Sequence, residues 1–549
     1  MQEIRAWLPD FENRWFYKGI LKFSETGIIS LNAIEESDSD SREELPLVLP
    51  GLVDAHVHIE SSMLVPSRFA ELAVRQGTVA TVSDPHEIAN VLGKEGVRFM
   101  IRNAREVPLK IHFTAPSCVP ATDFEEAGAR LNAEDIAELL DDGNLVGLGE
   151  MMNFPGVLFE APDVMAKIDV AKKRNLPIDG HAPGLRGKDL NKYIQAGITT
   201  DHEATSLEEA REKIAMGMKI LIREGSAAKN FEALAPLIEE YPDKVMLCCD
   251  DLHPDDLMEG HLNKILKRGM KMGLNIFDLL MAASSNPIAH YDLNVGQLLE
   301  NDPADFMLVE SLDSMKVLST WINGEEVFRN GEICFKAQKS EQPNTFIDIG
   351  FKPDDFIIHG ETGQYRLIEV EDGSLFTRAS SAFIKSEEGI LMPDVKHDIL
   401  KIAVVNRYNR RKPALAWIRN FGLKTGAISS SVAHDSHNII VVGTSDAEIA
   451  AAVNALIDSR GGIAVVQGSG VQLLALPVGG IMSNESGETV GLKYRELSEE
   501  AKKMGSTLYA PFMTLSFMAL LVIPELKLSD QGLFDGTRFE FVDLKAEIK

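Results

Sequence analysis

The feature that most constrains the fold is an alternation of apolar, strand-like runs with amphipathic helical stretches between residues 51 and 304. Helical stretches such as SLEEAREKIAMG separate most of the apolar runs. Buried parallel strands have continuous apolar sequences, and about eight β/α units of this size are typical of a TIM-type barrel. The eight runs are Val53–His58, Thr78–Ser83, Lys110–Pro116, Leu145–Met152, Pro177–Ala182, Thr199–Ala204, Lys219–Gly225 and Lys244–Asp251. The sequence therefore predicts an α/β fold built on a (β/α)8 barrel.

The remaining sequence predicts two further regions, because 549 residues are too many for one compact core. Short strands and turns occupy residues 1–50 and 305–342, and we expect them to form one small β-domain beside a barrel over 51–304. Strand-like runs such as NIIVVG follow, so residues 343–549 are predicted to form a C-terminal α+β domain. The acidic run EESDSDSREE is predicted to be a solvated loop.

Composition excludes several classes of protein. With 55 basic and 83 acidic residues the formal charge is −28, so we expect no binding to nucleic acid or to anionic membranes. Four cysteines without a CxxC spacing indicate neither a disulfide framework nor a thiolate zinc site. The start of the chain lacks a signal-peptide pattern, and the longest apolar runs are shorter than the ~20 residues of a membrane span. We therefore expect a cytoplasmic protein.

Metal-ligating residue types fall at the ends of five predicted strands. They are His56, His58, Glu150, His181, His202 and Asp250. The active sites of TIM barrels lie at the carboxyl ends of the strands, so these side chains are expected to meet there. Four imidazoles and two carboxylates suit two divalent ions of the Fe, Mn or Zn type. Two such ions would lower the pKa of a shared water and supply hydroxide at neutral pH.

The two histidines of the first strand are a weaker signal by themselves. His56 and His58 are two residues apart, so both can face the barrel mouth, but an HxH pair also occurs without a metal. A lone histidine is more often a core or surface residue. The coincidence of five strand ends favours the metal site, and Glu150 is well placed to bridge two ions.

Several stretches resemble a known family. PGLVDAHVHIESS resembles the signature of the amidohydrolase superfamily, and GQLLENDPADFMLV resembles its closing segment. More narrowly, HVHIESSM, SDPHEIANV, LGEMMNFPGV, DGHAPG, DHEAT, IREGSAAKN, LCCDD, SSVAHDSHN and LPVGGIMS are similar to the adenine deaminase family. The resemblance implies hydrolytic deamination of adenine to hypoxanthine and ammonia, in purine salvage, by a hydroxide that bridges two divalent metals. It also implies that residues 343–549 form the family's C-terminal domain.

The resemblance further implies how the ions are held. His56, His58 and Asp250 would hold one ion and His181 and His202 the other, with Glu150 shared in place of the carboxylated lysine of many relatives. Mononuclear deaminases of the superfamily have a glutamate three residues after the histidine of the fifth strand. The stretch HAPG has none, which favours the two-metal form, with Mn²⁺ or Fe²⁺ expected first and Zn²⁺ also suitable.

Three residues are predicted to be catalytic. Asp250 would take a proton from the attacking water, although metal ligation alone is an equal alternative. Glu60 stands where dihydroorotase-like relatives have an arginine, and it would bind the edge of the adenine ring; the alternative is a salt bridge at the barrel rim. His86 would shuttle a proton, and its alternative is an ordinary loop histidine.

Other polar residues are assigned supporting roles. Ser61 and Asp251 are expected to bind substrate, while Asp251, Glu203 and Ser226 can also orient the metal ligands. His434 and His437 would reach the site only if the third region covers the barrel mouth, and structural roles are expected for both.

Two other functions compete with deamination of a small purine. The same ligands would serve another amidohydrolase reaction, such as cyclic-amide hydrolysis or deacetylation. A non-catalytic scaffold is the second alternative, but such proteins usually have incomplete ligand sets. A homodimer or a larger homo-oligomer is expected from barrels of this kind.

Overall fold

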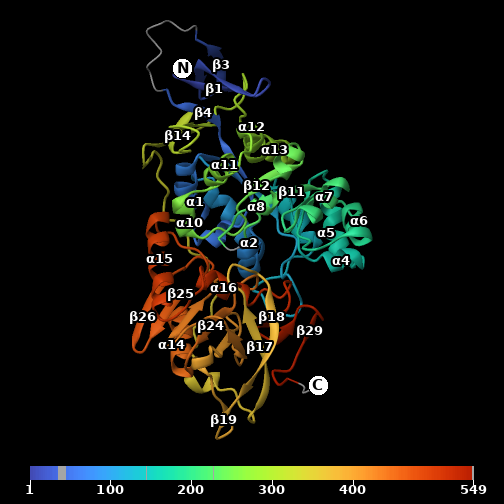
Figure 1. Ribbon diagram of the computed structural model, residues 1–549, viewed down its shortest axis with the longest axis vertical. Helices are drawn as coiled ribbons and strands as arrows, with labels where there is room; N and C mark the ends of the chain where they lie inside the picture. Colours follow the sequence, from blue (N-terminus) through green and yellow to red (C-terminus); the bar gives the residue numbers. More distant parts are fainter. Residues whose placement is uncertain (35–44, 144, 227, 547–549) are drawn as a thin grey trace.

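The computed structural model describes residues 1–34, 45–143, 145–226 and 228–546. The acidic run at 35–44, predicted to be a loop, lies outside the described residues. In Figure 1 the described chain forms an elongated molecule with the first strands at one end, the helix-rich middle of the sequence at its centre and the C-terminal sheet at the other end.

The central region is a barrel of parallel strands. These are β5 (Leu52–Val57), β6 (Thr78–Ser83), β7 (Lys110–Ala115), β8 (Leu145–Met151), β9 (Ile178–Gly180), β10 (Thr200–Asp201), β11 (Lys219–Arg223) and β12 (Val245–Cys248). Strands β5 to β9 form one parallel sheet and β10 to β12 another. The Thr199 amide donates to the Ile178 carbonyl at 2.9 Å, and Val57 forms a parallel bridge with Asp250, so both edges are joined. The predicted TIM-type barrel is confirmed, and each predicted strand overlaps an observed one.

Helices cover the outside of the barrel. The longer ones are α1 (Pro66–Ala73), α2 (His86–Ala104), α3 (Ala133–Asp141), α5 (Pro162–Lys172), α6 (Gly187–Gln195), α7 (Leu207–Ala215) and α11 (Leu262–Lys271). In α11 the side chains of Leu262, Ile265 and Leu266 are buried, which is the spacing of an amphipathic helix. The strands are enclosed between this layer and the barrel interior, so every residue of β5 and β6 is buried.

A second sheet combines strands from the two ends of the barrel sequence. Its order is β16-β15-β14-β13-β4-β1-β2-β3. The strands are β1 (Gln2–Asp10), β2 (Trp15–Ser24), β3 (Gly27–Ala33), β4 (Leu47–Pro50), β13 (Phe306–Val309), β14 (Val317–Ile322), β15 (Glu325–Arg329) and β16 (Glu332–Ile333). Phe23, Phe306 and Trp321 pack together in its core, with the Phe306 and Trp321 rings stacked at 5.7 Å. The sheet thus draws on both of the segments predicted for the small β-domain.

The C-terminal region contains a third sheet, of order β18-β17-β22-β21-β24-β23-β25-β26. Its strands are β17 (Gly363–Val370), β18 (Thr377–Ile384), β21 (Leu400–Val405), β22 (Ala414–Arg419), β23 (Ala427–Ser430), β24 (Ile439–Gly443), β25 (Gly462–Gln467) and β26 (Gly470–Ala475). Helix α14 (Asp446–Asp458) packs Ile449, Val453 and Leu456 against one face.

The C-terminal region packs against the carboxyl end of the barrel and is hydrogen-bonded to it. Helices α15 (Gly487–Lys503) and α16 (Pro511–Phe517) lie between the third sheet and the barrel, and α15 packs on α10 (Pro254–Glu259) (Figure 1). The Ser483 amide donates to the Met63 carbonyl at 2.8 Å, and the Val65 amide donates to the Ser483 carbonyl at 3.2 Å. These bonds lie shortly after β5 and His58, which follows it, so the C-terminal region reaches the barrel mouth.

A buried lysine in this region gives a stability prediction. Lys527, in β27 (Leu526–Ser529), is fully buried and donates only to the carbonyls of Leu375 and Phe517, at 2.6 and 3.0 Å, among the described residues. Burial lowers its pKa from 10.5 to about 7. Between these values the unfolded chain binds a proton that the folded chain does not. The contribution of Lys527 to stability therefore rises with pH, by about 1.4 kcal/mol per unit.

Thermal unfolding of Lys527→Met measures this effect. We expect the Tm of the native protein minus that of the variant to increase from about pH 7 to about pH 9. Lys213 is a matched control, because it is equally buried but pairs with Asp201 and Glu209, which raise its pKa against the effect of burial. The corresponding Tm difference for Lys213→Met should stay constant over this range. If the Tm differences of both variants rose in parallel, the lowered pKa assigned to Lys527 would be wrong.

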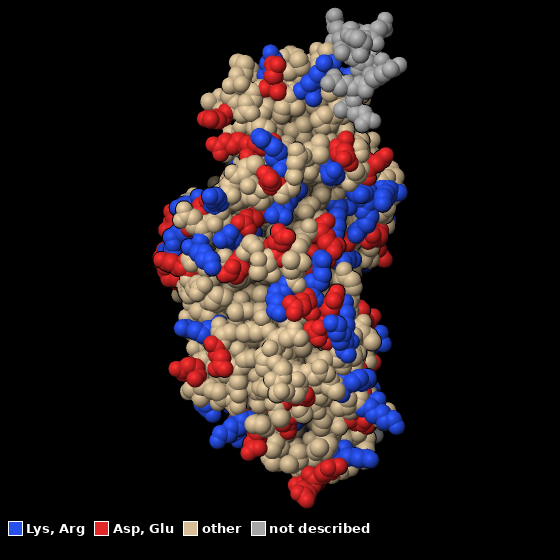
Figure 2. Space-filling model, turned by 90° about the vertical axis from the view of Figure 1, so that its left-hand side faces the viewer, with Lys and Arg blue, Asp and Glu red and all other residues tan. Residues whose placement is uncertain are grey.

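The surface in Figure 2 carries Lys and Arg interspersed with Asp and Glu rather than a patch of one sign. None of the helices in the described part of the chain combines the length and the apolar character that a membrane span requires.

Candidate metal centre and substrate pocket

The six predicted ligand residues converge at the carboxyl end of the barrel. His56 lies in β5, His58 directly follows it, and Asp250 follows β12. Asp250 Oδ1 is 3.4 Å from His56 Nε2 and 3.1 Å from His58 Nε2. The Asp250 amide donates to the His56 carbonyl at 2.9 Å, so the barrel closure itself sets these three side chains side by side.

Glu150 lies at the centre of the cluster. Its Oε1 is 3.2 Å from His58 Nε2, and its Oε2 is 2.7 Å from His181 Nδ1 and 3.1 Å from His202 Nε2. Burial raises the pKa of this carboxyl, but the three histidines outweigh burial and hold it well below its ordinary value. The geometry therefore places one carboxylate between the His56, His58 and Asp250 set and the His181 and His202 pair.

The donor chemistry of this cluster fits divalent transition metals. Its nitrogen and oxygen atoms are buried and form overlapping groups of three within 4.8 Å, such as His56, His58 and Asp250, and His56, Glu150 and His202. No cysteine belongs to these two groups, which agrees with Fe, Mn or Zn in an imidazole and carboxylate site. His58 Nδ1 lies 3.0 Å from the Asp84 carbonyl, which orients its Nε2 toward the cluster.

An arginine beside the cluster was not predicted. The Arg223 guanidinium donates to Asp250 Oδ2 at 2.7 Å and to Glu203 Oε2 at 3.0 Å. Burial opposes its charge, but the two carboxylates outweigh burial and raise its pKa. Glu203 Oε1 is also 3.5 Å from His181 Nδ1 and from His202 Nε2. Arg223 is the last residue of β11. The only sequence feature that could have predicted its role is a charged residue near the end of the predicted seventh strand.

A small inner pocket of about 30 Å³ opens onto the ligand cluster. Its described lining includes five of the six predicted ligand residues, all but His56. The other lining residues are His86, Glu87, Met152, Glu203, Arg223, Asp251, Leu375, His434, Asp435, Phe517 and Leu520. His86 begins α2 and has Nδ1 3.5 Å from Glu150 Oε1. Although burial lowers the pKa of His86, Glu87 and other neighbouring carboxylates raise it well above the ordinary value. Of the three residues predicted to be catalytic, Asp250 and His86 line this pocket.

Glu60 and Ser61 lie one layer behind the pocket. Glu60 Oε1 accepts from the Ile88 amide at 3.2 Å, and burial raises its pKa to about 7. The Ser61 hydroxyl donates to Asp251, which does line the pocket. Ser226 is not in the pocket lining, but its amide donates to the Asp251 carbonyl at 2.8 Å, while its hydroxyl donates to Asp256 at 2.6 Å and accepts from the His253 amide at 2.8 Å.

The C-terminal region completes the pocket. Glu87 forms an ion pair with His434 Nδ1 and accepts a hydrogen bond from His437 Nε2, and both histidines lie about 350 residues away in sequence. His434, Asp435 and Phe517 line the inner pocket. His434 and His437 were expected to reach the site only if the third region covers the barrel mouth. The structure shows that it does.

A larger cavity of about 940 Å³ adjoins the inner pocket. It lies between the barrel and the C-terminal region and shares Met152, Glu203, Arg223 and Leu375 with the inner pocket. A cavity of this size holds small organic ligands with room to spare, so it offers a path to the cluster.

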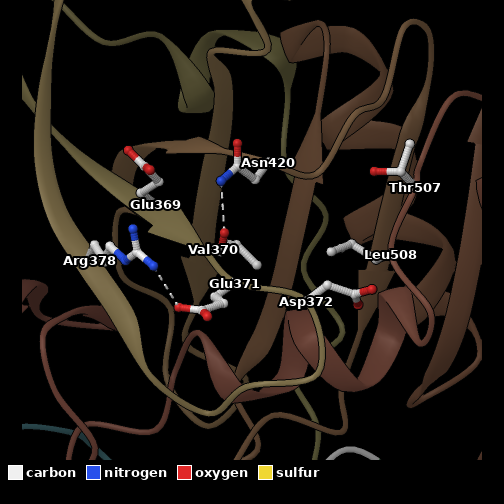
Figure 3. Close-up of a pocket in the computed structure, with 8 residues that line it drawn as sticks. All are labelled: Glu369, Val370, Glu371, Asp372, Arg378, Asn420, Thr507 and Leu508. Carbon is white, nitrogen blue, oxygen red and sulfur yellow. Dashed lines mark hydrogen bonds and ion pairs between the residues drawn. The ribbon is translucent and has the colours of Figure 1, made fainter.

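Another cavity, of about 330 Å³, lies wholly within the C-terminal region (Figure 3). Arg378 donates to Glu371 at 3.2 Å there, and Asn420 Nδ2 donates to the Val370 carbonyl at 2.8 Å. Neither a histidine nor any predicted site residue is among the described residues that line it. It shares no lining residue with the inner pocket at the ligand cluster.

Sequence comparisons agree with this geometry. The amidohydrolase family model matches residues 47–327, and that of the adenine deaminase C-terminal domain matches residues 374–540. A barrel with this ligand cluster and this match defines the class as a metal-dependent amidohydrolase. Adenine deaminase from Methanosarcina mazei is 52% identical over 560 residues, covering 100% of both chains. Those from Salinibacter ruber (51% identical, 90% of this chain and 91% of the relative) and Borreliella burgdorferi (43%, 98% and 99%) are also similar. The chain belongs to the adenine deaminase family.

Proposed function

We propose that the chain catalyses hydrolytic deamination of adenine to hypoxanthine and ammonia. The observation that carries this proposal is the buried ligand cluster at the barrel mouth in a chain that matches adenine deaminases over its whole length. His56, His58 and Asp250 would hold one divalent ion, His181 and His202 a second, and Glu150 both. Such ions, Mn²⁺ or Fe²⁺ before Zn²⁺, would supply a hydroxide nucleophile at neutral pH.

The protein's own groups would move the protons of the reaction. Water adds to C6 of adenine, N1 gains a proton, and the C6–N bond breaks as the amine leaves protonated. Asp250 accepts the proton of the attacking water, and Arg223, bound to Asp250 Oδ2, fixes the orientation of its carboxylate. His86, 3.5 Å from Glu150 and on the pocket wall, carries a proton toward the ring or the leaving amine.

Other assignments support substrate binding. Asp251 contacts the ring from the pocket wall, and Ser61 holds the Asp251 carboxylate in place. Glu60 is kept as a proposed substrate-binding residue, although it lies behind Glu87 and Ile88 and would have to act through a movement of α2. Its substitution by glutamine should raise the KM for adenine if this role is correct.

The remaining expectations are also proposals. The division into 1–50 with 305–342, 51–304 and 343–549 is supported by the sheets, because no sheet combines strands from two of these three regions. The assembly into a homodimer or a larger oligomer, the role in purine salvage and the cytoplasmic location stay predictions.

The test is a substrate panel with protein loaded with Mn²⁺ or Fe²⁺. We expect adenine to be converted to hypoxanthine with release of one ammonia per ring, followed by ultraviolet absorbance and by ammonia assay. Cyclic amides and N-acetyl amino sugars in the same panel represent the alternative amidohydrolase reactions. Turnover of one of these, with none of adenine, would overturn the proposal.

A further inference from the structure

Two polar side chains of the C-terminal region reach the inner pocket without a complete set of partners. His434 and Asp435 lie between β23 and β24, and each is only 3% exposed. Both line the pocket beside the ligand cluster. A buried polar atom without a partner is costly, so its presence in a pocket wall indicates a ligand group that pairs with it.

The His434 ring is held from two sides. Its Nδ1 is paired with Glu87, and its ring stacks on Phe517 with a centroid distance of 5.0 Å and an interplanar angle of 22°. Its Nε2, on the other side of the ring, is buried and has no hydrogen-bond partner among the described residues. Burial lowers the pKa of His434, but Glu87 and Asp251 raise it to about 9. Nε2 is therefore a hydrogen-bond donor at neutral pH.

Asp435 supplies the complementary acceptor. Its Oδ1 is 3.7 Å from His86 Nε2, and its Oδ2 is buried with no hydrogen-bond partner among the described residues. The two side chains are adjacent in sequence and share the pocket wall. Together they present one donor and one acceptor to whatever enters.

We propose that His434 and Asp435 bind an edge of the purine ring, His434 donating to a ring nitrogen and Asp435 accepting from the neighbouring N–H. Adenine has two edges of this pattern: N7 beside the amino group, and N3 beside N9–H. This inference rests on the proposed function, and it makes the C-terminal region part of the substrate-recognition site of the barrel.

Variants of the two residues test the inference. In metal-loaded protein, His434→Ala and Asp435→Asn should raise the KM for adenine about 10- to 100-fold, with a smaller change in kcat and an unchanged metal content. His434→Gln, whose amide can donate near the position of Nε2, should recover part of the loss. Ser436→Ala is the matched control, because Ser436 lies next in the same loop, bonds to Asn438 and is outside the pocket lining; its KM should equal that of the native protein.

Two further measurements complete the test. In the native protein, 7-deazaadenine or 3-deazaadenine should have a raised KM, and that penalty should disappear in His434→Ala. If adenine is not turned over, calorimetry of adenine binding to the metal-loaded protein separates this inference from the proposed function, because weaker binding by the variants still supports the inference. Native KM for adenine or, without turnover, native adenine affinity in both His434→Ala and Asp435→Asn would overturn it.

Discussion

Replacement of Asp250 by asparagine is expected to lower kcat for adenine by about three to four orders of magnitude. Asparagine keeps the size of the side chain but cannot accept a proton from the attacking water. The other ligands remain, so the variant should still bind metal, and its KM should change by less than about tenfold because the loss falls on the chemical step. Steady-state kinetics together with elemental analysis of the same sample measure both quantities.

The neighbouring aspartate is a matched control for this variant. Asp251 lies in the same turn and lines the same pocket, but its carboxylate bonds to Ser61 rather than to the His56 and His58 pair. Asp251→Asn should raise KM more than it lowers kcat. If Asp250→Asn retained full metal content and a kcat close to that of the native protein, proton transfer by Asp250 would be wrong.

Glu150→Gln is expected to abolish activity by removing metal. Glu150 is the one carboxylate within 3.2 Å of His58, His181 and His202 among the described residues, and a neutral amide cannot serve as a bridging anionic ligand. Loss of a bridging ligand weakens the binding of both ions. The purified variant should therefore contain well under one ion per chain and show no measurable turnover.

A glutamate whose side chain lies outside the ligand cluster controls for the change of charge. Glu224 pairs with Arg268 at 2.8 Å outside the ligand cluster, so Glu224→Gln should keep native metal content and turnover. Circular dichroism should show that Glu150→Gln keeps its folded secondary structure. A Glu150→Gln protein that retained two ions per chain would contradict the bridging role.

The barrel and its ligand cluster were accessible from sequence because both follow from local patterns. Continuous apolar runs identified the strands, and the residue at each strand end identified the side chains that cluster at the barrel mouth. In a closed barrel the carboxyl ends of all strands lie at the same rim. Residues at those ends, such as Glu150 and His202, are therefore close in space although they are far apart in sequence. The hydrogen bonds between the ends of β5 and β12 bring His56 and Asp250 together in this way.

The parts that sequence reasoning missed depend on long-range packing. Arg223 completes the surroundings of Asp250, but an arginine at a strand end has no metal-ligating chemistry to draw attention to it. The pairing of Glu87 with His434 and His437 requires the C-terminal region to cover the mouth, and no periodicity in either segment specifies that docking. For the same reason Glu60, two residues after His58 in sequence, could not be placed behind the pocket wall in advance.

The most direct test of the central claim is a metal titration of metal-depleted protein with Mn²⁺ or Fe²⁺ while adenine turnover is followed. Two overlapping ligand sets that share Glu150 predict that activity rises to a plateau at about two ions per chain, with hypoxanthine as the product. Full activity at one ion per chain, or no conversion of adenine with two ions bound, would contradict the account.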